Sequence, residues 1–180
     1  MQATGTSSLT DRMMGALRLN PTTYEEVEHD RGATSQALLI VVLAAIASAI
    51  GGASEGLGGL IAGVLASLLG WAVYSGLVYV VGTRVLGTSV TSASWQEVAR
   101  TMGFAYTPQL LAVFGFIPIL GWILVLVGFI WFLVASIVAI RHALDMSTGR
   151  AVGTALIALV GYIIIAGIVA AIFGIGVSLS

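Results

Sequence analysis

Long uncharged hydrophobic stretches alternate along the chain with short segments that carry nearly all of the charge. About 23 uncharged residues separate Arg31 from Glu55, and about 28 separate Glu55 from Arg84. A helix needs about 20 apolar residues to cross a hydrocarbon layer of about 30 Å. The first two stretches therefore predict one transmembrane helix each, at about residues 34–53 and 57–82.

The third uncharged stretch, residues 101–140, is about twice as long as one crossing needs. Gly115, Pro118 and Gly121 interrupt it near its middle, as expected of a turn between two helices. This stretch therefore predicts a helical hairpin with two spans. They cover about residues 104–117 and 119–140.

The final stretch, residues 151–180, contains no charged residue and predicts a fifth span at about 152–177. With 58% hydrophobic and 8% charged residues, the chain lies far from soluble domains, in which roughly a quarter of residues are charged. The sequence predicts an all-α, polytopic bundle of five transmembrane helices. A cytoplasmic segment with interfacial helices, residues 1–33, precedes the membrane domain, residues 34–180.

The seven basic residues are all arginines, and this arrangement of spans puts every one of them on the same side. They are Arg12, Arg18, Arg31, Arg84, Arg100, Arg141 and Arg150. Because basic loops stay in the cytoplasm, the N-terminus is predicted to be cytoplasmic and the C-terminus extracytoplasmic. The use of arginine in place of lysine also points to a GC-rich bacterial genome, and hence to a bacterial plasma membrane.

An alternative treats residues 38–50 as the apolar core of a cleaved signal peptide, with Ala47-Ser48-Ala49 as the cleavage site. The region before this core is over thirty residues long and acidic. A signal peptide begins with a short basic segment, so we favour a membrane-spanning helix at this position.

Two amphipathic helices are predicted on the inner side of the membrane. The first ends before Asn20-Pro21, and its apolar positions, at helical spacing, are Leu9, Met13, Ala16 and Leu17. The second begins after Ser94, which has capping-box spacing to Glu97 in the first turn. Both fit helices that lie on the inner leaflet, and the second is expected to kink at Pro108 and enter the membrane there.

A short acidic helix is predicted between the first amphipathic helix and the first span. Thr22 and Glu25 have capping-box spacing, so the helix is expected to run from Thr23 to Arg31. Its acidic residues are Glu25, Glu26, Glu28 and Asp30. They predict either a solvated face or a docking surface for a basic partner.

Small residues form stripes on three of the predicted spans. They are Gly59 and Gly63 on the second span, Gly121 and Gly128 on the fourth, and Gly167 and Ala171 on the fifth. Such spacing puts each pair on one face, where helix backbones approach closely in lipid, either within the bundle or with a second chain. Trp71 and Trp131 lie near mid-span, so their indole N–H groups need partners inside the bundle or against a bound lipid or pigment.

No arrangement of residues predicts catalysis, a metal site or a cofactor. The chain has no cysteine, and a Gly-x-Ser-x-Gly pattern at Gly52–Gly56 lacks the strand and the His-acid pair that a hydrolase needs. His142, at a helix end, is expected to complement the helix dipole; the alternative is a metal or pigment ligand. A net charge of −1 argues against nucleic acid as a partner.

Three segments resemble the Yip (Ypt-interacting protein) domain family, especially its bacterial members. They are Arg18–Tyr24, the Gly103-Phe-Ala-Tyr106-Thr-Pro108 sequence before the third span, and the inner loop His142–Ala151. The resemblance implies five spans with an inside N-terminus. In eukaryotic members it also implies association with prenylated Rab GTPases and with one another. Their acidic Asp-Leu-Tyr-Gly-Pro motif has no clear counterpart here, so Rab-type GTPase binding is not expected.

Three functions fit this sequence. The favoured one is a non-enzymatic scaffold or adaptor in the bilayer that organises the membrane or other integral membrane proteins. An accessory transmembrane subunit of a larger bioenergetic or transport complex is the first alternative. The second is a pore for a neutral solute, since the predicted spans carry no ionisable side chain for ion coupling. Its candidate lining residues are Ser48, Ser67, Tyr74, Ser75 and Ser136.

Overall fold

The computed structural model describes residues 7–52, 56–89 and 91–172, and within these ranges the regular structure is entirely helical. The elements in chain order are α1 (Leu9–Leu17), α2 (Pro21–His29), α3 (Ala33–Gly51), α4 (Gly56–Val80), the π-helix η1 (Val81–Val85), α5 (Trp95–Ala105), the 3-10 helix η2 (Thr107–Phe116), α6 (Leu120–Ala143) and α7 (Thr148–Ile172). The predicted all-α class is confirmed.

Four helices are long and apolar enough to cross a membrane: α3, α4 with η1, α6 and α7. They correspond to the first, second, fourth and fifth predicted spans. The predicted third span, residues 104–117, is not a long α-helix, because the chain there ends α5 and continues as η2. Helix length alone therefore supports four crossings. The predicted count of five depends on whether η2 also crosses the membrane. The end of the predicted fifth span and the serine at position 54 lie outside the described residues.

Side-chain caps set where the short helices begin. Ser8 and Asp11 form a capping box at α1, and Ser94 and Glu97 form the predicted one at α5. The predicted box of Thr22 with Glu25 is wrong. The Asn20 side chain accepts a hydrogen bond from the Thr22 amide, and Pro21 occupies the first turn, where its missing N–H is not needed.

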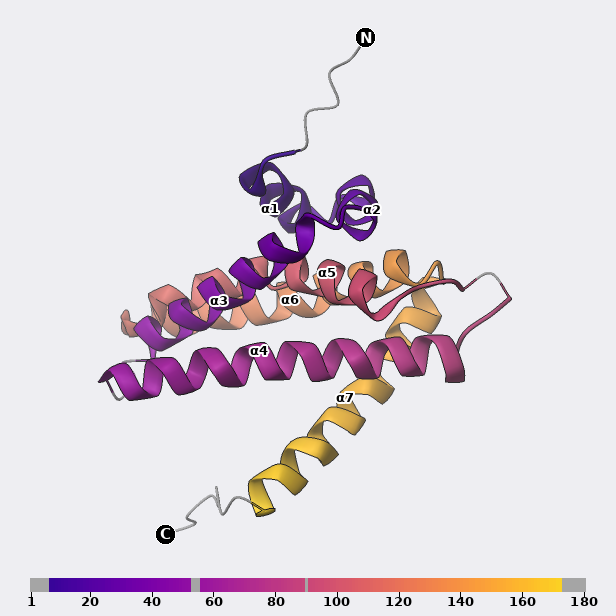
Figure 1. Ribbon diagram of the computed structural model, residues 1–180. Helices are drawn as coiled ribbons and strands as arrows, with labels where there is room; N and C mark the ends of the chain where they lie inside the picture. The colour runs from indigo at the N-terminus through magenta and orange to yellow at the C-terminus, as the bar shows by residue number, and fades with distance from the viewer. Residues whose placement is uncertain (1–6, 53–55, 90, 173–180) are drawn as a thin grey trace.

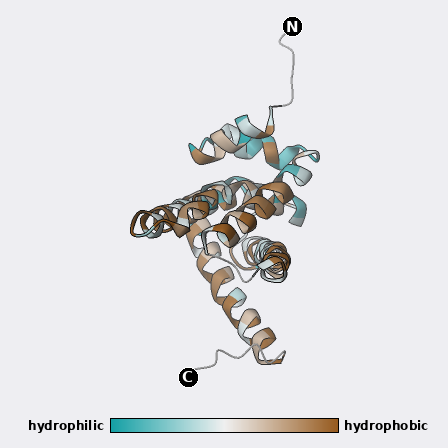
Figure 2. Cartoon of the chain, turned by 90° about the vertical axis from the view of Figure 1, so that its left-hand side faces the viewer, coloured by the Kyte–Doolittle hydropathy of each residue, from teal (hydrophilic) through white to brown (hydrophobic). Residues whose placement is uncertain are grey.

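The helices form a polar and an apolar part (Figures 1 and 2). α1 and α2 lie together on one side of the bundle and carry most of the hydrophilic residues in Figure 2. α3 packs on α4, and α5 and η2 lie between α3 and α6. α7 crosses α4, and its C-terminal half leads away from the other helices (Figure 1). The bundle therefore leaves much of α7 for lipid or for another protein.

The core lies where α5 packs between α3, α4 and α6. Val98, Met102 and Phe104 of α5 are fully buried there. Ile40 of α3 and Ile140 of α6 close the same cluster. The sequence predicts that this second amphipathic helix lies on the inner leaflet with one apolar face, whereas every residue from Val98 to Ala105 is buried. Other helices therefore surround this part of α5.

Candidate functional site

The stretch from the end of α5 through η2 runs in the same direction as α3 and in close contact with it. A Cβ atom on Gly103 would come within 2.6 Å of the Ala37 Cβ. At the other end of α3, a side chain on Gly51 would collide with the backbone carbonyl of Ala112, next to Gly115. Glycine at these positions lets the two backbones touch, and this explains Gly103 as a packing residue.

The other side of η2 packs on α6 through the predicted small-residue stripe. A Cβ on Gly128 would lie 2.8 Å from the Pro108 carbonyl oxygen and 3.3 Å from the Leu111 Cβ. A Cβ on Gly121 would collide with the backbone of residues 114–115. Both glycines are buried. The α6 stripe is therefore used within the chain, which favours the first of the two interpretations of this stripe.

Pro108 lies where the chain changes from α-helix to 3-10 helix. The predicted kink is thus a change of helix type. α5 ends at Ala105, and η2 continues for 10 residues, an unusual length for a 3-10 helix. Proline lacks the N–H for an α-helical hydrogen bond and its ring clashes with the preceding turn, so it favours a break in the α-helix here.

Tyr106 and Pro118 lie at opposite ends of η2. The Tyr106 ring packs edge-on against Phe132 of α6, with 4.8 Å between ring centroids. Pro118 is exposed in the turn before α6, and its carbonyl accepts a hydrogen bond of 2.7 Å from the Leu120 amide. These contacts fix the direction in which η2 enters and leaves the bundle.

The small residues on α4 and α7 contrast with those on α6. Gly63 and Gly167 are exposed, and a Cβ on either would meet no described atom within 4 Å. Ala171 is exposed as well, and Gly59 is partly so. Within the described chain, these two stripes have no helix packed against them at Gly63 and Gly167.

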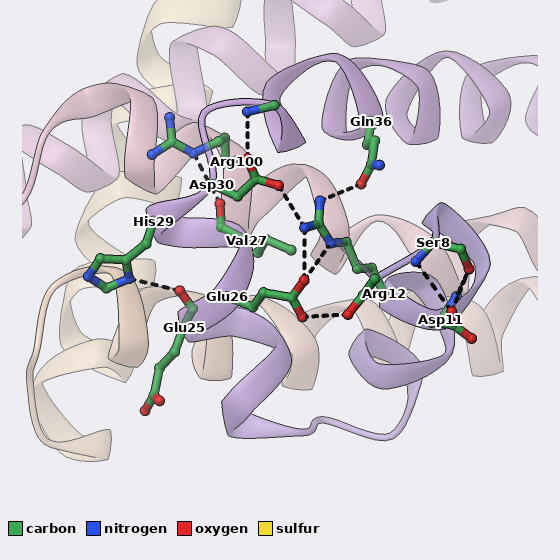
Figure 3. A network of polar contacts seen from close by, with 12 residues as sticks. Ser8, Asp11, Arg12, Glu25, Glu26, Val27, His29, Asp30, Gln36 and Arg100 are labelled. Atoms are coloured by element: carbon green, nitrogen blue, oxygen red, sulfur yellow. Dashed lines mark hydrogen bonds and ion pairs between the residues drawn. The ribbon is translucent and has the colours of Figure 1, made fainter. Parts of the chain in front are cut away.

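A buried arginine holds α1, α2 and the start of α3 together (Figure 3). Arg12 is only 2% exposed, and its Nη2 donates to Glu26 Oε1 at 2.8 Å and to Asp30 Oδ2 at 2.6 Å. Its Nη1 donates to Gln36 Oε1 at 2.8 Å. The Arg12 guanidinium also lowers the pKa of Asp30 below its usual value. One side chain thus joins three helices through charge-assisted hydrogen bonds.

A second buried arginine fastens α2 to α5. Arg100 donates from Nε to the Val27 carbonyl at 3.1 Å and from Nη2 to the Glu28 carbonyl. Carbonyl groups in the last turn of a helix lack partners within the helix, and a cation at that end complements the helix dipole. Arg100 therefore both caps α2 and attaches it to α5.

One of the two interpretations of the acidic residues in and next to α2 was a solvated face. The structure does not show such a face. Glu26 and Asp30 pair with Arg12, and Glu28 is buried. Glu25 remains exposed, with Oε1 3.5 Å from His142 Nδ1. The other interpretation was a docking surface for a basic partner. Glu26 and Asp30 do bind a basic group, but that group is Arg12 of the same chain.

Burial makes Glu28 a pH-sensitive group in the docked helix. Desolvation raises its pKa from 4.5 to about 7. Because the folded state binds this proton more tightly, the stability it contributes is fully present below pH 4.5 and is lost as the pH rises through about 7, by on the order of 3 kcal/mol at most. Thermal unfolding in detergent across this range should show the fall. Glu28→Gln should flatten it, and an unchanged profile in that variant would contradict the assignment.

Both mid-span tryptophans find the partners that the sequence required. Trp71 is buried, and its indole N–H donates to the Ala99 carbonyl of α5 at 3.0 Å. Trp131, a residue that is 41% exposed, donates to the Leu17 carbonyl at the end of α1 at 2.8 Å. Trp131 therefore joins α6 to the N-terminal helices.

His142 lies in the last turn of α6, as predicted, and faces α2. Its ring stacks on Tyr24 with 6.3 Å between centroids and 10° between planes. Its buried Nε2 has no hydrogen-bond partner in the described part of the chain. Among the described residues, no group of three or more His, Asp and Glu side chains could hold a metal ion.

The comparisons agree with the resemblance seen in the sequence. A family model described as the Yip1 domain matches residues 14–172. The chain belongs to the Yip1 domain family. The match begins at Met14, within α1, and includes all of α2 and all of the long helices. No curated protein and no solved structure matches the chain.

The candidate pore residues of this Yip1 domain line different cavities. Ser48 and Ser67 line a cavity of about 210 Å³ between α3 and α4. Tyr74 and Ser136 line another of about 320 Å³ between α4, α6 and α7. Ser75 is buried in α4. Tyr106 lines both cavities and stands between the two groups.

Two residues that the sequence did not single out, Arg12 and Arg100, hold the inner-face helices in place. Both were expected to contribute positive charge on the inner side, and both are buried at helix contacts. Arg12 does lie one helical turn from Ser8 on a helix rich in apolar residues, but nothing in its spacing identifies Glu26 as its partner.

Proposed function

We propose that this Yip1 domain is a non-enzymatic membrane scaffold that binds transmembrane helices of other integral membrane proteins. The observation that carries the proposal is the contrast between the two kinds of small-residue stripe. η2 packs directly against Gly121 and Gly128 of α6, whereas a Cβ on Gly63 of α4 or on Gly167 of α7 would meet no described atom within 4 Å.

The physics of lipid supports this use of α4 and α7. Apolar side chains gain little by leaving lipid for a protein surface, so helices associate in membranes chiefly through close packing and interhelical hydrogen bonds. A glycine that faces lipid lets a second backbone approach within packing distance. The C-terminal half of α7, which leads away from the bundle, presents Gly167 and Ala171 in this way (Figure 1).

We further propose that the Yip1 domain crosses the membrane five times, with η2 as the third crossing. Ala37 and Gly103 adjoin at the start of α3, and Gly51 and Gly115 adjoin at its end. Between these points α3 rises about 21 Å at roughly 1.5 Å per residue. From Gly103 to Gly115 the chain rises about 4 Å in the end of α5, and then about 18 Å in η2 at about 2.0 Å per residue. This segment therefore matches the rise of α3 with fewer residues, at about 22 Å.

With five crossings, the arginine-rich ends of the helices all lie on one side. That side is then the cytoplasm, the C-terminus is extracytoplasmic, and the arginine usage supports a bacterial plasma membrane. Arg12 already pairs with Glu26 and Asp30, two of the acidic residues that could attract a basic partner. This pairing gives no support to Rab-type GTPase binding.

Crosslinking in native membranes followed by mild-detergent purification tests the scaffold. We expect a specific membrane protein to be recovered with the natural chain and lost with the double variant Gly63→Leu and Gly167→Leu. Leucine at either position has room in the free chain, so the fold should be retained. Ile61→Phe, at a 53% exposed position of the same helix, is the matched control.

The same experiment separates the alternatives. Equal loss of the partner in Ile61→Phe, or no specific partner at all, would contradict the scaffold. Stoichiometric migration with a large bioenergetic or transport complex would favour the accessory subunit. Solute flux in liposomes that contain the chain alone would favour the pore.

A further inference from the structure

An apolar cavity of about 320 Å³ opens between α4, α6 and α7, within the size range of small-molecule pockets. Tyr74 and Tyr162 form its floor, with their rings edge-to-face and 6.2 Å between centroids. The Tyr74 hydroxyl donates to the Ala155 carbonyl at 3.2 Å, and the Tyr162 hydroxyl lies over Gly70. The floor is therefore an aromatic surface, held in place by the contact between the two rings and by the hydrogen bond from Tyr74 to the α7 backbone.

The rim of the cavity belongs to helices that are long and apolar enough to cross the membrane. Leu133 of α6 is 42% exposed, and Leu156 of α7 is 58% exposed. A cavity between two such helices opens sideways into hydrocarbon. The molecules that surround it there are lipids, and an acyl chain is the part of a lipid that fits an apolar cavity.

The α6 side of the cavity leads directly to a positive charge. Phe129, Leu133 and Ile137 line it at intervals of four residues, which puts them on one face of the helix. Arg141 continues this series at the cytoplasmic end and is exposed. Arg150 of α7 lies nearby in sequence, but it shares a separate cavity with Asp145.

We infer that this groove is a lipid site, which binds one acyl chain of an anionic phospholipid and holds its phosphate at Arg141. The acyl chain moves from one apolar environment to another and gains only packing against the aromatic floor. Discrimination between lipids must then come from the headgroup, since basic residues at the inner end of transmembrane helices attract anionic lipids. This site is separate from the small-residue stripes of the proposed scaffold.

Native mass spectrometry of the full chain tests the site, with dioleoyl phosphatidylglycerol and dioleoyl phosphatidylcholine as probes. The two have the same acyl chains and differ in headgroup charge. We expect one tightly retained phosphatidylglycerol, preferred about fivefold over phosphatidylcholine. Arg141→Gln should remove this preference. Arg84→Gln, at an exposed position on the same side of the membrane, should keep it.

A second pair of variants tests the groove itself. Leu156→Trp fills it and should abolish retention of both lipids. Ile164→Trp, at a position of α7 that is 56% exposed and does not line the cavity, should leave retention unchanged. Equal retention of the two lipids by the natural chain, an equal effect of Arg84→Gln, or unchanged retention in Leu156→Trp would overturn the inference. So would a dimer that Leu156→Trp dissociates, because the groove would then hold a helix.

Discussion

Arg12→Met is expected to weaken the attachment of α1 and α2 to each other and to the start of α3. Methionine has a similar length but leaves the carboxylates of Glu26 and Asp30 without their cation. Breaking a buried ion pair by removing one partner costs about 3–5 kcal/mol. The two carboxylates retain 35% and 32% of their exposure, so we expect a loss at the lower end, about 3 kcal/mol.

Hydrogen exchange of the amides in α1 and α2 is the measurement for this variant. A loss of about 3 kcal/mol corresponds to a fall in protection of roughly two orders of magnitude, provided that these helices open as a unit. Arg18→Met is the matched control, because Arg18 is an exposed arginine at the C-cap of the same helix. If both variants keep natural protection, Arg12 does not hold the helices, and the network in Figure 3 contributes little.

Gly128→Leu is expected to destabilise the bundle by about 3 kcal/mol, at the upper end of the usual cost of overpacking. The new side chain would meet the Pro108 carbonyl, which is backbone and cannot move without displacing η2. Thermal unfolding in detergent, followed by size-exclusion chromatography after heating, should show an earlier transition.

Gly63→Leu provides the comparison, because it adds the same atoms to a glycine with no neighbour within 4 Å. We expect its transition to stay close to that of the natural chain. Equal transitions for Gly128→Leu and Gly63→Leu would mean that η2 does not pack on α6 as described.

The long helices could be predicted from sequence because lipid imposes a minimum length. The uncharged runs between Arg31 and Glu55 and between Glu55 and Arg84 locate α3 and α4 to within a few residues. The capping box at Ser94 was equally readable, because a cap is a local feature. The Asn20 cap was missed, since the Thr22 and Glu25 spacing offered a competing start.

The 3-10 helix and the inner-face contacts could not be read in this way. Hydrophobicity is the same in α-helical and 3-10 segments, so residues 107–116 gave no sign of the change beyond Pro108. The pairing of Arg12 with Glu26 depends on how α1 folds back on α2. Charge alone cannot distinguish this pairing from two solvated groups.

The sequence identifies single residues of the candidate site, but it does not show which of them contact one another. The sequence singles out Gly103, Pro108, Gly121 and Gly128. The last three meet around η2, and Gly103 packs on Ala37 of α3 just before η2 begins. Gly63 and Gly167 have the same small-residue pattern, yet they face outward. Spacing identifies a face on which close approach is feasible, and only the packing shows whether a helix of the same chain occupies it.

The direction of η2 across the membrane is the point on which the proposed architecture depends. The chain has no cysteine, so single cysteines at the exposed positions of Ser92, Pro118 and Ser147 can be labelled without background. In intact cells, a membrane-impermeant maleimide should react with the cysteine at position 118 and reach those at 92 and 147 only after lysis. A cysteine at position 118 that stays protected until lysis, as at position 92, would mean that η2 returns to the side it left and that the protein does not cross the membrane five times.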